Sequence, residues 1–186
     1  MRIIAGKFKS RTVKAPKSQT IRPTSDKVKG ALFNMLEPIE GCSVADLFAG
    51  TGNLGIEALS RGASQVVFVD KGKEALGLLR ENLGSLGIPE RSEAIEIMAC
   101  EVAQAFYLLH QAGRKFDILM ADPPYQSGVL KRLQQLLKEF PILAKGGIFA
   151  VEHDAKDTEL AADFPYPMVR QKKYGDTMLT LFRRED

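Results

Sequence analysis

Apolar residues along the chain alternate between short continuous runs and longer amphipathic stretches. The short runs predict strands over residues 43–48, 65–69, 94–98, 116–121 and 147–152. The amphipathic stretches between them predict helices over residues 53–61, 73–83, 102–111 and 129–140. Strands that alternate with helices are typical of a mostly parallel sheet, because the crossover helices cover both of its faces. The pattern therefore predicts an α/β fold.

The first forty residues depart from this alternation. Alternating apolar positions over residues 1–17 predict a short β-hairpin. After it, Thr24 or Ser25 is expected to cap a helix that runs to about Leu36. We expect these elements to form a distinct N-terminal unit over residues 1–37.

The end of the chain also changes character. Residues 169–174 and 178–182 read as two strands joined by Gly175-Asp176, which predicts a closing antiparallel hairpin. Together with the five earlier strands, this hairpin predicts a seven-stranded, mostly parallel sheet. We assign the sheet and its helices to one domain over residues 38–186.

Composition places the chain among ordinary globular proteins. It has 186 residues, of which 45% are hydrophobic and 26% are charged. Cys42 and Cys100 match no metal or redox spacing, so we expect two reduced thiols and no metal. No apolar leader opens the chain, and no stretch approaches the length of a membrane span. We therefore expect a cytoplasmic monomer with no membrane partner.

Charge is distributed unevenly along the chain. Residues 1–30 carry nine basic side chains against one acid, whereas the remaining residues carry 17 basic and 22 acidic side chains. A basic arm on an acidic body favours binding to a polyanion such as RNA, because clustered cations displace counterions from phosphates. A solvated tail is the alternative interpretation. The candidate RNA-binding residues are Arg2, Lys7, Lys9, Arg11, Lys14 and Arg22.

A glycine-rich loop follows the first strand of the alternating region. The sequence from Gly50 to Gly55 matches G-x-G-x-x-G, and Asp70 ends the next strand twenty residues later. Such a loop lets the backbone approach a ligand, and an acid at that position can accept hydrogen bonds from ribose hydroxyls. NAD and S-adenosylmethionine both fit this pattern.

Asp46 distinguishes the two cofactors. It lies four residues before the first glycine. A carboxylate there would repel a pyrophosphate, whereas it would attract the ammonium and sulfonium groups of S-adenosylmethionine. The alternative is a carboxylate that only anchors the loop. We favour S-adenosylmethionine as the cofactor and S-adenosylhomocysteine as its product.

A second motif follows the predicted strand over residues 116–121. Asp122, Pro123, Pro124 and Tyr125 stand where the carboxyl edge of the sheet is expected, on the same side as the glycine loop. The aspartate and a proline carbonyl supply two acceptors for an NH2 group, and the tyrosine ring offers a stacking face. These residues are candidates for catalysing methylation of an exocyclic amine. A stiff turn after a strand is the alternative.

The combined motifs resemble a known family. The pairing of the FxGxG loop with D-P-P-Y resembles amino-methyltransferases of nucleic acids. The sequence is similar over nearly its whole length to the RsmD family, bacterial small-subunit rRNA guanine-N2 methyltransferases. The segments that carry this resemblance are Met1–Lys7, Arg22–Val28, Ala31–Leu36, Asp46–Gly52 and Tyr174–Thr177.

The resemblance implies a Rossmann-like class I methyltransferase fold and methyl transfer to guanine N2 of 16S rRNA in the assembling small subunit. It implies that the helix after Arg22-Pro23-Thr24 helps cover the cofactor. Glu101, or Cys100 before it, would lie near the adenine. The residues expected to bind the cofactor are Thr24, Asp46, Phe48, Gly50, Gly52, Asp70, Glu101 and Asp122.

Three other functions remain open from the residues alone. An adenine-N6 methyltransferase of RNA or DNA would use the same D-P-P-Y loop, because adenine also presents an NH2 group. An NAD-dependent oxidoreductase would explain the glycine loop but not Asp46. A non-catalytic RNA-binding assembly factor would explain the basic arm.

Overall fold

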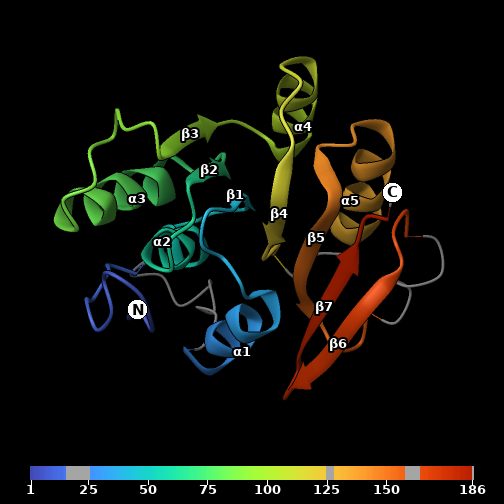
Figure 1. Ribbon diagram of the computed structural model, residues 1–186, viewed down its shortest axis with the longest axis horizontal. Helices are drawn as coiled ribbons and strands as arrows, with labels where there is room; N and C mark the ends of the chain where they lie inside the picture. Colours follow the sequence, from blue (N-terminus) through green and yellow to red (C-terminus); the bar gives the residue numbers. More distant parts are fainter. Residues whose placement is uncertain (16–25, 125–127, 158–163, 186) are drawn as a thin grey trace.

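The computed structural model describes residues 1–15, 26–124, 128–157 and 164–185. Its centre is a seven-stranded sheet with the strand order β3-β2-β1-β4-β5-β7-β6 (Figure 1). Six strands run in one direction, and only β7 is antiparallel to its neighbours. The strands are β1 Ser43–Leu47, β2 Gln65–Asp70, β3 Ile95–Ala99, β4 Phe116–Ala121, β5 Leu143–Asp154, β6 Met168–Tyr174 and β7 Thr177–Arg183.

Within the described residues, five helices cover the sheet. α1, α2 and α3 contribute to the apolar cluster on one face, and α4 and α5 contribute to the cluster on the other face (Figure 1). Their bounds are α1 Asp26–Leu36, α2 Asn53–Ser60, α3 Lys73–Ser85, α4 Val102–Gln111 and α5 Val129–Glu139. The arrangement confirms the predicted α/β fold, including the C-terminal antiparallel hairpin. None of these helices is long and apolar enough to cross a membrane.

The two apolar clusters follow from the two-residue period of the strands. In β2, Val66 and Phe68 point to the face with α1, α2 and α3, whereas Val67 and Val69 point to the face with α4 and α5. All four side chains are buried. A strand that is buried on both faces needs a continuous apolar run, which is why the sequence pattern located β2 correctly.

The N-terminal hairpin is present in reduced form. Its described part has one isolated antiparallel bridge, between Arg2 and Thr12. The turn between them bends sharply, because Gly6 and Ser10 both have positive φ angles. The backbone N–H of Lys7 donates to the carbonyl of Ser60 in α2 instead of to a partner strand. Residues 1–15 therefore dock onto α2 as well as folding on themselves.

A buried carboxylate holds this segment in place. Glu57 of α2 accepts backbone N–H groups from Ile4 at 2.8 Å and Ala5 at 3.1 Å. Arg61 donates to the same carboxylate at 2.9 Å. The Lys29 ammonium of α1 lies 3.5 Å from it. Because Glu57 is fully buried, these groups replace the water that the carboxylate loses on folding.

Lys29 has a structural role that the charge count concealed. Its side chain is buried, and its ammonium also donates to the carbonyl of Arg2 and to the side-chain oxygen of Asn53, both at 2.8 Å. Burial lowers the pKa of Lys29, and the nearby carboxylate of Glu57 opposes that change. Lys29 joins α1, the N-terminal segment and the start of α2, so it adds no charge to the basic surface.

α2 approaches the sheet closely at a glycine. A Cβ atom at Gly55 would lie 2.2 Å from the Phe68 ring of β2. No side chain fits in that space, so the third glycine of the loop sets the distance between helix and strand. By contrast, a Cβ atom at Gly77 in α3 would meet no heavy atom within 4 Å.

Replacing Lys29 should destabilise the fold. We expect Lys29→Met to lower the free energy of unfolding by about 3 kcal/mol, because Glu57 would keep its charge in a buried site with one donor fewer. Urea unfolding followed by circular dichroism measures this change. Lys27→Met is the control, since Lys27 is exposed on the same helix and should change stability by less than about 0.5 kcal/mol. Equal unfolding midpoints for the two variants would contradict the role of Lys29.

The packing of Gly55 predicts opposite effects for two identical substitutions. Gly55→Ala should lower the free energy of unfolding by about 3 kcal/mol, because the added methyl group collides with Phe68. Gly77→Ala should raise it by about 0.5 kcal/mol, because alanine is the better helix former and the site is open. Thermal unfolding of both variants tests the pair, and a stabilised Gly55→Ala variant would refute the close approach.

Candidate functional site at the carboxyl edge of the sheet

The candidate site lies where the strand order reverses. β1 is flanked by β2 on one side and β4 on the other (Figure 1). The connection that leaves β1 leads to β2, whereas the connection that leaves β4 leads to β5, in the opposite direction along the sheet. Such a reversal opens a crevice beyond the carboxyl ends of parallel strands. The glycine loop follows β1, Asp70 ends β2 and Asp122 follows β4. The fold therefore gathers these three predicted site segments at one edge.

The glycine loop turns through left-handed backbone conformations. Gly50 and Gly52 have φ angles of 55° and 88°. A Cβ atom at Gly52 would lie 2.4 Å from the Leu79 side chain, so a larger residue would have to displace that side chain and adopt a strained left-handed conformation. Phe48 also has a positive φ of 76°, which is unusual for an aromatic residue. Strained positions of this kind are concentrated at ligand sites.

Asp70 fixes the loop from the neighbouring strand. One of its carboxylate oxygens accepts the N–H of Gly50, and the other accepts the N–H of Gly72, each at 2.7 Å. Each oxygen has a further lone pair for another donor. The arrangement holds the loop and α3 in place and leaves Asp70 able to accept a ribose hydroxyl, which stays a prediction.

Asp46 is buried beneath the loop. Its carboxylate accepts the N–H of Gly55, in the first turn of α2, at 2.8 Å. Burial raises the pKa of Asp46 to about 7, and the charges of Asp122 and Asp70 add to the rise, while the hydrogen bond from Gly55 opposes it. Asp46 therefore anchors the loop, as its alternative interpretation held. Its unfavourable ionisation also makes the site receptive to a cation.

The Asp122 loop begins beside the glycine loop. Asp122 directly follows the last residue of β4, which pairs in register with the last residue of β1. Its side chain is half-buried, Pro123 is buried and Pro124 is exposed. Both prolines lack an N–H, so the chain there offers carbonyl acceptors without donors. Tyr125, predicted to stack on the base, lies outside the described residues.

The remaining cofactor candidates are placed less centrally. Glu101 lies shortly after β3, is exposed, and pairs with Lys71, which directly follows β2, with 3.0 Å between the charged groups. Cys100 is half-buried beside the cluster under α4. Both residues lie at the same edge as Asp70, and their predicted contact with the adenine stays a prediction. Thr24 lies outside the described residues.

The predicted RNA-binding residues of the N-terminal segment are partly engaged within the protein. Arg2 lies 3.8 Å from Asp26, and Lys14 pairs with Glu81 of α3 at 2.7 Å. Arg11 donates to a backbone carbonyl at the end of α3 at 2.7 Å. These contacts orient the side chains but neutralise part of the charge that the sequence count assigns to this segment.

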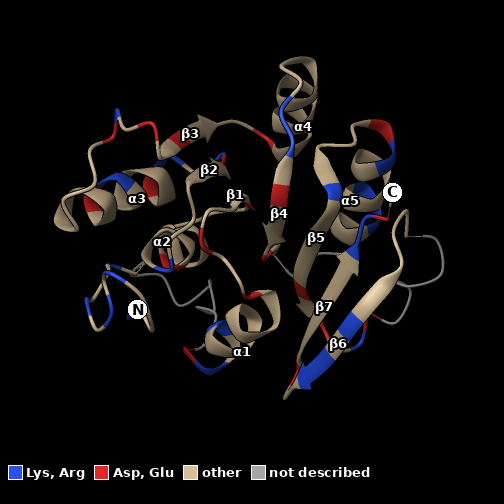
Figure 2. Cartoon of the chain, in the orientation of Figure 1, with Lys and Arg blue, Asp and Glu red and all other residues tan. Residues whose placement is uncertain are grey.

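The other members of that set differ in setting. The Lys7 ammonium lies 5.4 Å from the centre of the neighbouring Phe8 ring, which is a cation–π distance. Lys9 is exposed in the turn. Arg22 lies outside the described residues. Figure 2 shows the basic residues of this segment in blue beside α2 and α3.

Sequence reasoning missed the residue that links this segment to the glycine loop. Asn82 of α3 is buried, and its side chain donates to the carbonyls of Lys14 and Thr51, each at 3.0 Å. Its oxygen accepts the N–H of Lys14 at 2.7 Å. An asparagine inside an amphipathic helix carried no signal beyond its polarity on an apolar face.

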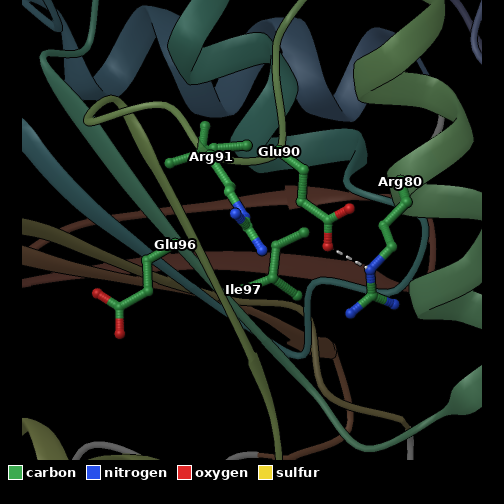
Figure 3. Close-up of a pocket in the computed structure, with 6 residues that line it drawn as sticks. Arg80, Glu90, Arg91, Glu96 and Ile97 are labelled. Atoms are coloured by element: carbon green, nitrogen blue, oxygen red, sulfur yellow. Dashed lines mark hydrogen bonds and ion pairs between the residues drawn. The ribbon is translucent and has the colours of Figure 1, made fainter.

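A hollow in the surface lies away from the predicted residues. It has a volume of about 620 Å³ and sits against β3 and α3 (Figure 3). Its arginine Arg80 pairs with Glu90 at 2.7 Å, and Glu96 pairs with Arg114 at 3.1 Å. Because no predicted site residue lines it, the hollow does not displace the carboxyl edge as the candidate site.

Comparison with known proteins identifies the family. The model of a family described as "Conserved hypothetical protein 95" matches residues 1–183. YlbH of Bacillus subtilis, provisionally named an rRNA methyltransferase, is 36% identical over 99% of each chain. Ribosomal RNA small subunit methyltransferase D of Escherichia coli is 31% identical over 100% of this chain and 90% of its own. The structure of yhhF from Escherichia coli, provisionally named a methyltransferase, has a TM-score of 0.85 at 29% identity, covering 100% of this chain and 98% of that one.

These findings agree with the geometry of the site. The relatives named as rRNA methyltransferases align with nearly the whole chain, and the similar structure spans every element of the sheet. They support an rRNA methyltransferase and give no support to the nicotinamide hypothesis. The chain therefore belongs to the family described as conserved hypothetical protein 95, the RsmD family that its motifs resemble, and has the Rossmann-like class I methyltransferase fold.

Proposed function

We propose that this protein transfers a methyl group from S-adenosylmethionine to the exocyclic N2 amine of a guanine in 16S rRNA of the assembling small subunit. S-adenosylhomocysteine is the other product. The observation that carries this proposal is the Asp122-Pro123-Pro124 segment, which begins one residue beyond β4 and beside the glycine loop. Membership of a family that includes ribosomal RNA small subunit methyltransferase D supports the RNA substrate.

The charges at the sheet edge fit a cationic cofactor. Asp46, Asp70 and Asp122 lie close enough for the last two to raise the pKa of the first. A pyrophosphate would add to this repulsion, whereas an ammonium or sulfonium group relieves it. Bound S-adenosylmethionine supplies an activated methyl group, so no metal is required. Asp70 would hold the ribose, and the turn from Gly50 to Gly52 would lie against the methionine part.

The Asp122 loop then acts on the base. An exocyclic amine is a poor nucleophile, because its lone pair is delocalised into the ring. The Asp122 carboxylate and a proline carbonyl would accept its two hydrogens, which turns the lone pair toward the methyl group. Asp122 would also take up the proton that the amine releases. Positioning and electrostatics contribute most of the rate. A base within a helix cannot reach this site, so the target is unpaired or flipped out.

The proposed substrate also bears on where the protein acts and on how it selects its target. An enzyme of ribosome assembly works in the cytoplasm, and we propose that it acts as a monomer. A chain of 186 residues has little surface for reading a long RNA sequence. We therefore expect ribosomal proteins or folded RNA shape to help select the target nucleotide.

Asp122 is the residue to replace first. Asp122→Asn should lower the rate of methyl transfer about 100-fold or more, because the amide cannot take up the proton and presents its own NH2 group to the amine. The assay supplies S-adenosylmethionine and small ribosomal subunits from a strain that lacks the enzyme, and mass spectrometry identifies the methylated nucleoside. Glu139→Gln, at the end of α5, is the exposed control.

Each outcome of that assay bears on one hypothesis. N2-methylguanosine formed by the wild type and lost in Asp122→Asn supports the proposal. N6-methyladenosine would favour the adenine-N6 alternative. Undiminished methylation by Asp122→Asn would remove the role of Asp122. Binding of the subunit without any turnover by the wild type would favour a non-catalytic assembly factor.

Asp46 should make cofactor binding depend on pH. Its pKa of about 7 lies above the value of an exposed aspartate, so below pH 7 the carboxyl of the unliganded protein is protonated. A bound cation favours the ionised form. The affinity for S-adenosylmethionine should therefore fall about tenfold for each unit of pH below 7 and level off above it.

Calorimetry between about pH 6 and pH 8 measures this dependence and the proton released on binding. Asp46→Asn keeps an oxygen acceptor for the N–H of Gly55, so the loop should stay in place while the affinity becomes weaker and nearly independent of pH. The same pH dependence in wild type and Asp46→Asn would exclude Asp46 as its source.

A further inference from the structure

The edge strand β6 carries a row of exposed cations. Arg170, Lys172 and Lys173 lie along it, and each is exposed. Figure 2 shows their blue segments on the outermost strand of the sheet, at the opposite end from the N-terminal segment. The hairpin of β6 and β7 with its following arginine, residues 168–184, contains five basic residues and one acid, which gives a charge of +4.

These cations differ from Arg2 and Lys14 of the N-terminal segment in what surrounds them. Within the residues that the structure describes, no carboxylate pairs with Arg170, Lys172 or Lys173. Arg2 and Lys14, by contrast, each have an acidic neighbour. An external anion can therefore bind the cations of β6 without breaking an ion pair within the described residues, whereas binding to Arg2 or Lys14 would compete with an acidic side chain.

β6 also ends at the functional edge of the sheet. It runs parallel to the central strands, so its C-terminal residues lie at their carboxyl side. Lys172 is in register with Leu179 of β7, and Leu179 is in register with Glu152 of β5. Val151, which precedes Glu152, is in register with Ala121 of β4, and Asp122 follows Ala121. Glu152 and Asp122 are therefore at the same level of the sheet. Three steps of about 4.8 Å between strands place Lys172 about 14 Å from Asp122 along the sheet.

The row presents charge on both sides of the strand. Side chains alternate along a strand, so Arg170 and Lys172 point to one face of the sheet and Lys173 points to the other. The Lys172 ammonium lies 5.4 Å from the centre of the half-buried Tyr174 ring, which orients that side chain near the carboxyl end. A charged ridge of this form can contact phosphates on either side of it.

We propose that Arg170, Lys172 and Lys173 of β6 form a second RNA-binding surface, which holds the sugar–phosphate backbone of nucleotides that flank the methylated base. This inference rests on the proposed function for its substrate. A span of about 14 Å corresponds to a few nucleotides of an extended strand, so RNA held at β6 could reach the Asp122 loop directly. Phosphates of the RNA would supply the negative charge that no carboxylate of the described residues supplies to these three cations.

Protection of the sheet edge is the competing explanation. Lysines on an edge strand prevent pairing with the edges of other molecules, because burying them would cost their hydration. That explanation predicts that removing the charges promotes association of the protein and leaves RNA affinity unchanged. It makes no prediction about salt.

The test compares two triple variants of equal charge. Arg170→Gln/Lys172→Gln/Lys173→Gln removes the cations of β6, and Lys131→Gln/Lys138→Gln/Lys145→Gln removes three exposed cations of α5 and the amino end of β5. Fluorescence anisotropy measures binding to a labelled single-stranded RNA oligonucleotide, to protein-free small-subunit rRNA and to small ribosomal subunits over a range of salt concentrations.

The β6 variant should bind both RNAs more weakly, by up to about 100-fold at 0.1 M salt, and the loss should shrink as salt rises. The slope of log affinity against log salt should become shallower by about 2, because three phosphate contacts are lost at about 0.7 each. The control variant should keep a slope close to that of the wild type. Sedimentation velocity and thermal unfolding show whether both variants stay dispersed and folded.

Several results would overturn the inference. Equal salt slopes for the β6 and control variants would do so, as would association of the β6 variant with unchanged RNA affinity. Normal binding to protein-free rRNA with loss of binding to the small subunit would assign the surface to a ribosomal protein instead. The methylation assay of the wild-type protein tests the proposed function without any assumption about β6. A failure of this inference can therefore be distinguished from a failure of the proposed function.

Discussion

The buried carboxylate of Glu57 joins parts of the chain that the sheet alone would leave apart. It binds two amides of the N-terminal segment, the ammonium of Lys29 in α1 and the guanidinium of Arg61, which directly follows α2. The helix that carries it begins at the glycine loop. A carboxylate with no access to water needs these donors, so the N-terminal segment and α1 are held where they border the site. The N-terminal segment and α1 therefore belong to the same buried network as α2, the helix that follows the glycine loop.

Carboxylates at the sheet edge have two roles at once. Asp46 and Asp70 hold the backbone of the glycine loop at the edge where strand order reverses, and each carboxylate has further lone pairs for another donor. A ligand that binds them meets groups already fixed by the fold, so little ordering is needed on binding. The anchoring role and the ligand role of Asp46 are therefore compatible, although the sequence presented them as alternatives.

Sequence patterns located the sheet well because its strands are buried on both faces and read as continuous apolar runs. They placed the start of β5 too late, since the exposed Lys145 and Gly146 interrupt the run within the strand. The carboxyl-edge residues were also predictable, because parallel strands bring their ends together whatever lies between them. The buried pair of Lys29 and Glu57 was not, because a charged residue on a helix is normally solvated and only the tertiary structure supplies its partner.

Charge along the sequence predicted one basic surface, and the fold divides it. Part of the N-terminal charge is used in contacts with α1, α2 and α3, whereas β6 carries cations that the described residues leave uncompensated. The two regions lie at opposite ends of the sheet, with the Asp122 loop between them. If RNA crosses the carboxyl edge, it meets cations on both sides of the reacting base. The chain can then hold a nucleotide in place from two sides, because the sheet itself spaces the two contacts.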